Sequence, residues 1–205
     1  GQFDAGVAEG YGTITYPGGV VFSGEWKNNN RTGQGVLWTK ENGRPMVLAG
    51  EFKDGRATGQ VTEILTDGSI YVGEVGNEGK EGHGTLTHLN GSKYGGEFRD
   101  NAVNGQGTWT YPNGEVYTGQ WKDEEYHGVG TFTDLEGSRY SGEWKNSLRQ
   151  GQGEQLYKKS ARTFAGEWKN QSPWKGTVTD EEGAAVAAYL KGVRSDSALS
   201  FLVRR

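Results

Sequence analysis

The sequence predicts an all-β fold, an elongated single sheet built from antiparallel β-hairpins stacked as repeats. Three elements recur in linked order: an aromatic-x-Gly-acid/amide-aromatic segment, a Gly-x-Gly step, and an Asn-Gly or Asp-Gly pair. The period is about 23 residues, with about eight units and a partial one at the start. Self-similarity at a fixed period of this length is typical of a repeat array, in which each unit contacts only its neighbours.

In the first element, apolar or glycine residues alternate with polar residues, as in a strand that buries one face. In Tyr117-Thr-Gly-Gln-Trp121, the residues Tyr117, Gly119 and Trp121 share one face, while Thr118 and Gln120 lie on the other. The copies of this segment are Phe22–Trp26, Leu48–Phe52, Tyr71–Val75, Tyr94–Phe98, Tyr117–Trp121, Tyr140–Trp144 and Phe164–Trp168.

The second element is a strand of the same kind. In the stretch 105–111, Gly105, Gly107, Trp109 and Tyr111 alternate with polar residues, which indicates a half-buried strand. A turn such as Pro112-Asn113-Gly114 joins two such strands into a hairpin. Because a glycine leaves space for a neighbouring ring, we expect ring and glycine to pack reciprocally, with most rings in the core.

Composition narrows the function classes. The 36 glycines recur at fixed positions, which separates the chain from aperiodic Gly-rich disorder. There is no cysteine, hence no disulfide framework. The net charge of −4 argues against nucleic acid as a partner and does not favour phospholipid. No apolar run approaches the roughly 18 residues that a membrane-spanning helix needs.

The two ends of the chain depart from the repeat. Residues 1–3 lie one period before residues 24–26, so the chain begins inside a unit and we expect further sequence upstream. We assign residues 1–183 to the array and residues 184–205 to a degenerate last repeat and a C-terminal cap. The segment 195–205 is predicted to form a short helix with Ser195 or Asp196 near its N-cap. Self-association would use Leu199, Phe201 and Leu202 of this end.

These linked motifs resemble the MORN (membrane occupation and recognition nexus) repeat. The resemblance covers residues 1 to about 183 and implies hairpins stacked into a twisted sheet with an aromatic-lined groove, and no catalysis by the repeats. The pattern breaks at Val61, at Val75, at Pro173 and after Gly183. We expect functional surface at the groove rim and at these breaks.

No catalytic constellation accompanies the repeats, so we predict a non-enzymatic chain without cofactor. His83, His88 and His127 have no cysteine partners and lie near turn glycines, which argues against a metal site. The leading hypothesis is a scaffold that presents the groove to a protein or peptide partner. The rings predicted to line the groove are Tyr94, Phe98, Trp109, Tyr111, Tyr117, Trp121, Tyr140, Trp144 and Trp168.

Four alternatives stay open. Lys158, Lys159 and Arg162 form a basic cluster that would bind phosphoinositide head groups if the chain targets membranes. Similar arrays accompany catalytic domains, so this chain is alternatively the regulatory region of a larger enzyme. A glycan-binding array is a weaker option. An acidic residue or Gln precedes the last residue of each copy of the first element, with a Lys or Arg two residues after the acid or Gln in most copies. This pattern predicts exposed ion pairs, or alternatively a row of acidic side chains that binds a basic peptide.

For the location in the cell, the sequence favours the cytoplasm, with association to cytoskeleton or membrane as further options.

Overall fold

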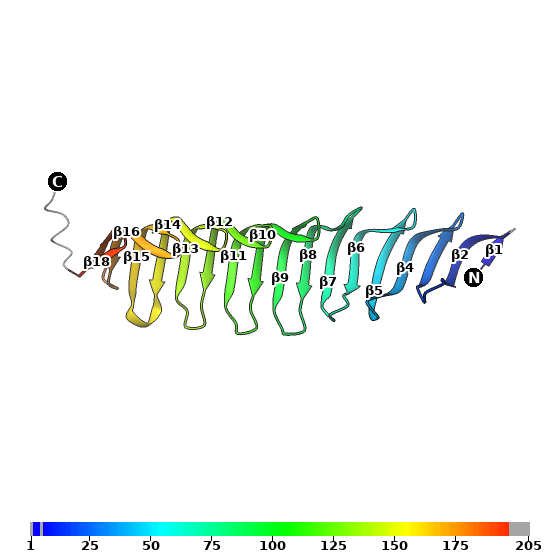
Figure 1. Ribbon diagram of the computed structural model, residues 1–205, viewed down its shortest axis with the longest axis horizontal. Coiled ribbons are helices and arrows are strands. Elements are labelled where there is room, and N and C mark those ends of the chain that lie inside the picture. Colours follow the sequence, from blue (N-terminus) through cyan, green and yellow to red (C-terminus); the bar gives the residue numbers. More distant parts are fainter. Residues whose placement is uncertain (1, 5, 197–205) are drawn as a thin grey trace. The chain divides into compact units, whose positions relative to one another are not determined.

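The computed structural model describes residues 2–4 and 6–196, which form β-strands and one short 3₁₀ turn (Figure 1). The chain divides into two compact units, residues 1–102 and 103–205. The strands of the first unit are β1 (Gln2–Asp4), β2 (Val7–Thr15), β3 (Val21–Lys27), β4 (Asn30–Glu41), β5 (Arg44–Lys53), β6 (Arg56–Ile64), β7 (Ile70–Gly76), β8 (Gly79–Thr87) and β9 (Lys93–Arg99).

The second unit starts with β10, whose first residue is the boundary residue Ala102. Its elements are β10 (Ala102–Thr110), β11 (Val116–Lys122), β12 (Glu125–Thr133), β13 (Arg139–Lys145), β14 (Leu148–Tyr157), η1 (Lys158–Ser160), β15 (Arg162–Lys169), β16 (Ser172–Thr179), β17 (Ala185–Leu190) and β18 (Val193–Ser195).

Within each unit, consecutive strands pair antiparallel in chain order. The predicted all-β array of antiparallel hairpins is therefore confirmed. In the regular hairpins, the first strand carries the aromatic-x-Gly segment and the second carries the Gly-x-Gly step.

Two kinds of turn alternate along the chain. The longer turn is the predicted one: around Pro112-Asn113-Gly114, the Gly114 N–H donates to the Tyr111 carbonyl at 2.9 Å. The other is a two-residue turn such as Asn146-Ser147, in which both residues have positive φ, 50° and 60°. This backbone is that of a type I′ turn, whose usual sequence is Asn-Gly. Because the second residue here is not glycine, the sequence analysis missed these turns.

The tight turns also bond one hairpin to the preceding hairpin. The Ser147 N–H donates to the Tyr126 carbonyl at 3.0 Å, and the Tyr126 N–H donates to the Ser147 hydroxyl at 3.2 Å. Gln171 and Arg149 form the same pair of bonds, at 3.1 and 2.8 Å. Both Ser147 and Gln171 have positive φ and a side-chain oxygen that accepts this bond, which a glycine could not supply.

The core is made of rings that lie on glycines. Tyr140 is fully buried, and its hydroxyl donates to the Glu143 carbonyl at 3.0 Å. Gly142 and Gly153 face each other across β13 and β14, and a Cβ on Gly153 would lie 2.6 Å from carbons of the Tyr140 ring. Any side chain at Gly153 would displace that ring, so the second glycine of the Gly-x-Gly step is required sterically.

In the repeats that contain it, the tryptophan connects the repeat to the preceding one. The indole N–H of Trp144 donates to the Gly130 carbonyl at 3.1 Å, and that of Trp168 donates to the Gly153 carbonyl at 3.2 Å. Edge-to-face ring contacts also join neighbouring repeats. The ring centre of Tyr140 lies 5.0 Å from that of Trp144 in its own repeat and 5.0 Å from that of Trp168 in the next. Each such pair adds roughly 0.5–1.5 kcal/mol beyond its buried area.

The recurrent acid stabilises a β-bulge. Glu143 accepts the Gln152 N–H at 2.7 Å, at the point where the register between β13 and β14 shifts. Gly151 beside it has φ 61°, and a Cβ there would lie 2.5 Å from the Glu143 carboxyl carbon. Gln120 accepts the Val129 N–H at 2.9 Å in the same way. A neutral amide serves equally, which indicates that the position needs an acceptor and no charge.

The predicted ladder of acid and base pairs is therefore wrong for these residues. Neither Glu25 with Lys27 nor Glu143 with Lys145 forms an ion pair, because the carboxylates bond to the bulge. The sequence shows only that acid and base share a face. The bulge turns the acid toward the backbone, and no spacing rule reveals it.

Gly153→Ala is expected to lower the free energy of unfolding by about 1 to 3 kcal/mol, because the new methyl overlaps the Tyr140 ring. Gly95→Ala is the matched control, since a Cβ at Gly95 meets only the Thr85 hydroxyl at 3.8 Å. Urea denaturation of both variants checks this. Equal losses for the two variants would contradict the steric explanation.

The free energy of unfolding is expected to fall as the pH rises from about 10 to about 12, because burial raises the pKa of Tyr140 from 10.0 to about 12. Below pH 10 the hydroxyl is protonated in both folded and unfolded chains. Above it, the unfolded chain loses the proton first and is favoured.

Tyr140→Phe removes both this proton and the bond to Glu143, so it costs about 1 kcal/mol at pH 8. Its deficit relative to the wild type should shrink at pH 11. Urea denaturation at the two pH values measures this, and a deficit that grows with pH would reverse the sign of the argument.

Candidate functional site

Most rings predicted to line an open groove are inside the core. Seven of the nine are buried, with exposed fractions from 0 to 6%: Tyr94, Phe98, Tyr117, Trp121, Tyr140, Trp144 and Trp168. Trp109 and Tyr111 are partly buried, and the Tyr111 hydroxyl bonds to that of Tyr126. The prediction that these seven rings offer surface to a partner is therefore corrected, because they are buried. Alternation identifies the face on which a ring lies, but not how completely its neighbours cover it.

The predicted basic cluster lies around η1, and all three of its side chains are exposed. Lys159 forms an ion pair with Glu136. The Lys158 N–H donates to the Ser138 hydroxyl at 3.2 Å, and Arg162 begins β15. Since Glu136 already offsets one charge, the cluster is less cationic than the sequence suggests.

Of the predicted C-terminal cap, residues 184–196 lie within the described residues, and Ser195 is the last residue of β18. The helix predicted after it lies outside the described residues. Leu199, Phe201 and Leu202, the predicted contacts for self-association, lie outside the described residues.

Hollows open where the repeat pattern breaks. In the first unit, Val75 stands where neighbouring repeats have Phe52 or Phe98, and a hollow of about 290 Å³ lies beside it. Leu48, Phe52 and Val75 contribute apolar lining. Lys80 and Glu63 at this hollow form an ion pair of 2.9 Å whose side chains are only 14% and 15% exposed.

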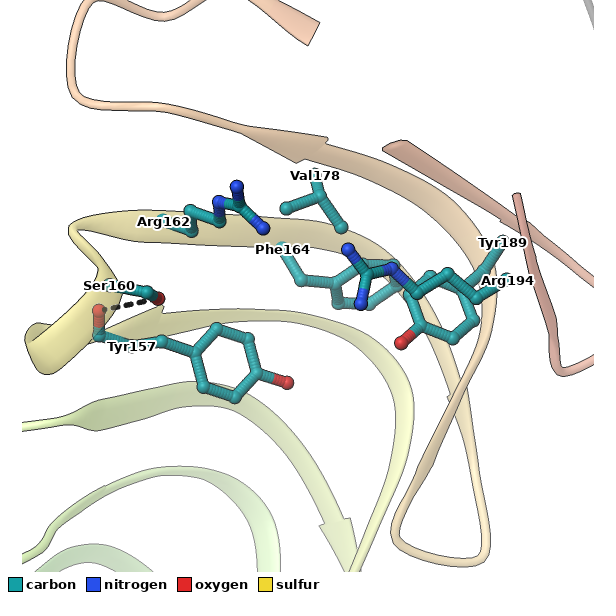
Figure 2. A pocket seen from close by; sticks show the side chains of 7 residues that line it. All are labelled: Tyr157, Ser160, Arg162, Phe164, Val178, Tyr189 and Arg194. Carbon is teal, nitrogen blue, oxygen red and sulfur yellow. Dashed lines mark hydrogen bonds between the residues drawn. The ribbon is translucent and has the colours of Figure 1, made fainter. Parts of the chain in front are cut away.

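The second unit has a hollow of about 280 Å³ near its C-terminal end, after the repeat has lost its Gly-x-Gly step. Figure 2 shows its lining, in which Tyr157 and Tyr189 point their hydroxyls toward one another across the opening. Phe164, which is fully buried, contacts Tyr189 edge to face at 5.4 Å. The lining is completed by Ser160, Arg162, Val178 and Arg194.

The charge around this C-terminal hollow is positive. Arg162 takes part in none of the ion pairs of the described residues, while Arg194 pairs with Asp196 at 2.7 Å. Burial, followed by the nearby Tyr189, raises the pKa of Tyr157, so its hydroxyl stays a hydrogen-bond donor at neutral pH. Two phenol groups and two guanidinium groups around an apolar base suit a ligand that is both apolar and acidic.

Sequence analysis identified Arg162 but missed Tyr157, Tyr189 and Arg194. A signal was present, because Tyr157-Lys-Lys-Ser160 lacks the glycine that ends the corresponding turns, such as Tyr111-Pro-Asn-Gly114. Tyr189 lies opposite Gly176, as Gly166 lies opposite Gly153 in the preceding hairpin, so a ring stands at the glycine position of the repeat. Only the pairing of β16 with β17 brings it beside Phe164.

Within residues 2–4 and 6–196, no group of three or more His, Asp or Glu side chains is arranged to hold a metal ion. Nor does that part of the chain contain a helix long and apolar enough to cross a membrane.

A family model of the MORN repeat matches five segments of the chain, residues 1–21, 22–44, 94–116, 117–139 and 140–162. The chain belongs to the MORN-repeat family. The family model leaves residues 45–93 and the residues after 162 unmatched. The first of these segments contains Val61 and Val75, and the second contains Pro173, where the sequence pattern breaks. None of the curated proteins compared with the chain matches it. MORN repeats are a non-catalytic repeat type and generally mediate interactions with proteins or membranes.

Val75→Phe is expected to raise the free energy of unfolding by about 0.5 to 2 kcal/mol, because it fills the hollow beside Phe52 with the ring that other MORN repeats have. Val72→Phe is the control, since Val72 lies in the same strand but is 49% exposed. Thermal and urea denaturation compare the two. A loss of stability for Val75→Phe alone would show that the hollow cannot accommodate a ring.

Proposed function

We propose that this MORN-repeat chain is a non-catalytic scaffold that captures an acidic peptide segment of a protein partner in the C-terminal hollow. The observation that carries the proposal is the contrast in burial. The rings of the aromatic-x-Gly segments are covered by their neighbours, whereas Tyr157, with 38% of its surface exposed, and Tyr189 remain accessible beside Arg162 and Arg194.

The chemistry of the hollow favours an acidic peptide with an apolar or aromatic side chain. Arginine binds carboxylates through paired N–H groups, and exposed aromatic rings supply contact area at a small entropic cost. A hollow of about 280 Å³ holds one or two side chains, so a linear segment fits better than a folded domain.

A membrane surface is the competing partner, and the ion pair of Lys159 with Glu136 argues against it. Electrostatic binding to anionic lipid commonly needs a cluster of about four or more basic residues. Self-association through the C-terminal end stays a separate prediction, which light scattering of the full chain tests.

The proposal is tested with a display library of short random peptides selected on the full chain. Selected peptides should be enriched in Asp and Glu, and the double variant Arg162→Ala/Arg194→Ala should bind them about tenfold or more weakly, since charged hydrogen bonds contribute roughly 1.5–3 kcal/mol each. Lys122→Ala/Lys145→Ala is the control, because it removes the same charge from exposed positions on β11 and β13.

Equal weakening by both double variants would mean that net charge alone attracts the peptides, and the hollow would lose its role. Vesicles that contain phosphatidylinositol bisphosphate provide the second arm. Flotation that depends on Lys158 and Lys159, combined with no selected peptide, would overturn the proposal in favour of a membrane surface.

A further inference from the structure

One position of the MORN hairpin, called here the slot, holds a polar residue in only some repeats. It lies two residues after the end of the Gly-x-Gly step, and in β10, β12 and β16 it is occupied by Trp109, Phe132 and Val178. In β6 the slot holds Glu63, and in β14 it holds Gln155. Because this face packs against the ring core, a polar residue here needs a specific partner.

Glu63 has that partner in the next hairpin. Lys80 in β8, which lies opposite Val75, forms the partly buried ion pair with Glu63. The corresponding position after Gln155 is Pro173, which lies opposite Trp168 in β16. Proline has neither a side-chain donor nor a backbone N–H, so the following hairpin provides no donor for Gln155 from this position.

Gln155 is consequently left with an unused acceptor inside the structure. Its side chain is 4% exposed, and its amide nitrogen donates to the Leu156 carbonyl at 2.9 Å. Its side-chain oxygen has no hydrogen-bond partner among the described residues. Leaving a buried acceptor unsatisfied is costly, and such atoms in folded proteins require an explanation.

Arg149 in the same strand has the complementary feature. Its guanidinium stacks over the rings of Tyr140 and Trp168, at 4.9 and 5.3 Å, and its buried Nε–H has no acceptor among the described residues. The slot in the preceding hairpin, where Glu63 stands relative to Lys80, holds the apolar Phe132. An unused donor and an unused acceptor thus lie on the same strand.

Both side chains line one hollow of about 400 Å³. Asp134 and Glu136 there are balanced by Arg149 and Lys159. Asp134 already accepts the N–H groups of Glu136 and Ser138, at 2.9 and 2.8 Å. A neutral group that both donates and accepts suits this hollow better than a phosphate or carboxylate.

We propose that Gln155 and Arg149 form a subsite for a main-chain amide of a bound peptide. Both atoms are enclosed in the unliganded chain, so binding requires the two side chains to turn into the hollow. There the peptide N–H donates to the Gln155 side-chain oxygen, and the peptide carbonyl accepts from Arg149 Nε–H. Tyr157 and Ser160 line both this hollow and the C-terminal hollow, so a neighbouring acidic side chain of the same peptide reaches Arg162. This inference rests on the proposed function, because it assigns the backbone contacts of the peptide whose side chains that function describes.

Gln155→Leu tests the subsite through two readouts of opposite sign. Removal of an unsatisfied buried acceptor should leave the unliganded chain as stable or more stable in urea. The same change should weaken the selected peptides about fivefold to tenfold, since it removes one hydrogen bond. A loss of both stability and affinity would show that Gln155 serves the fold, and would overturn the subsite.

A second measurement uses the unaltered protein, so it does not depend on the folding of a variant. Each amide of the best selected peptide is N-methylated in turn, which removes one N–H at a time. One position should lose about fivefold to tenfold in affinity for the wild type and nothing for Gln155→Leu. A uniform response in both proteins would overturn the subsite.

The two proposals fail in different ways. If selected peptides depend on Arg162 and Arg194 but ignore Gln155→Leu and N-methylation, the peptide-binding function stands and the main-chain subsite is wrong. If a simple alcohol such as glycerol competes with the peptide for the Arg149 hollow, the subsite recognises a hydroxyl group instead of an amide. If no peptide is selected at all, both proposals fail together.

Discussion

The packing of one ring on two glycines is the constraint on which the rest of the structure depends. Tyr140 can lie flat against β14 only because Gly142 and Gly153 have no side chains. Its hydroxyl and the Trp168 indole then reach backbone carbonyls, of Glu143 and Gly153. The hydroxyl and indole donors of these rings are thereby satisfied without a second sheet or helix to cover them. The dense glycine content is a steric requirement of this core.

A core of this kind buries the aromatic rings that the sequence pointed to as binding residues. The rings of the aromatic-x-Gly segments are covered by the rings of neighbouring strands, so a partner cannot contact them there. Breaks in the repeat pattern expose aromatic surface again. Where Val75 replaces a large ring, or where Pro173 and Tyr189 follow the last regular step, the packing leaves hollows lined by aromatic and cationic groups. In a repeat protein, the breaks therefore carry more functional information than the consensus.

Polar substitutions in the core follow a rule that acts between hairpins. Glu63 is tolerated because the next hairpin supplies Lys80. Gln155 is an acceptor whose donor is missing, because Pro173 stands where Lys80 stands relative to Glu63. Arg149 is a donor whose acceptor is missing, because Phe132 stands at the position of Glu63. Such groups reduce stability unless something binds them, which is the physical basis for treating the hollow between Asp134 and Tyr157 as part of a binding surface.

The sequence by itself determined the strand elements, their antiparallel order and the face on which each ring lies, because alternation and period are local properties. It also located the breaks. It did not reveal the β-bulge that turns Glu143 from an ion pair to a backbone acceptor, or the non-glycine tight turns such as Asn146-Ser147. The burial of Trp144 and the meeting of Tyr157 with Tyr189 depend on which hairpins neighbour each other and how closely they pack. Only the tertiary structure decides those contacts, because they join residues that no spacing rule relates.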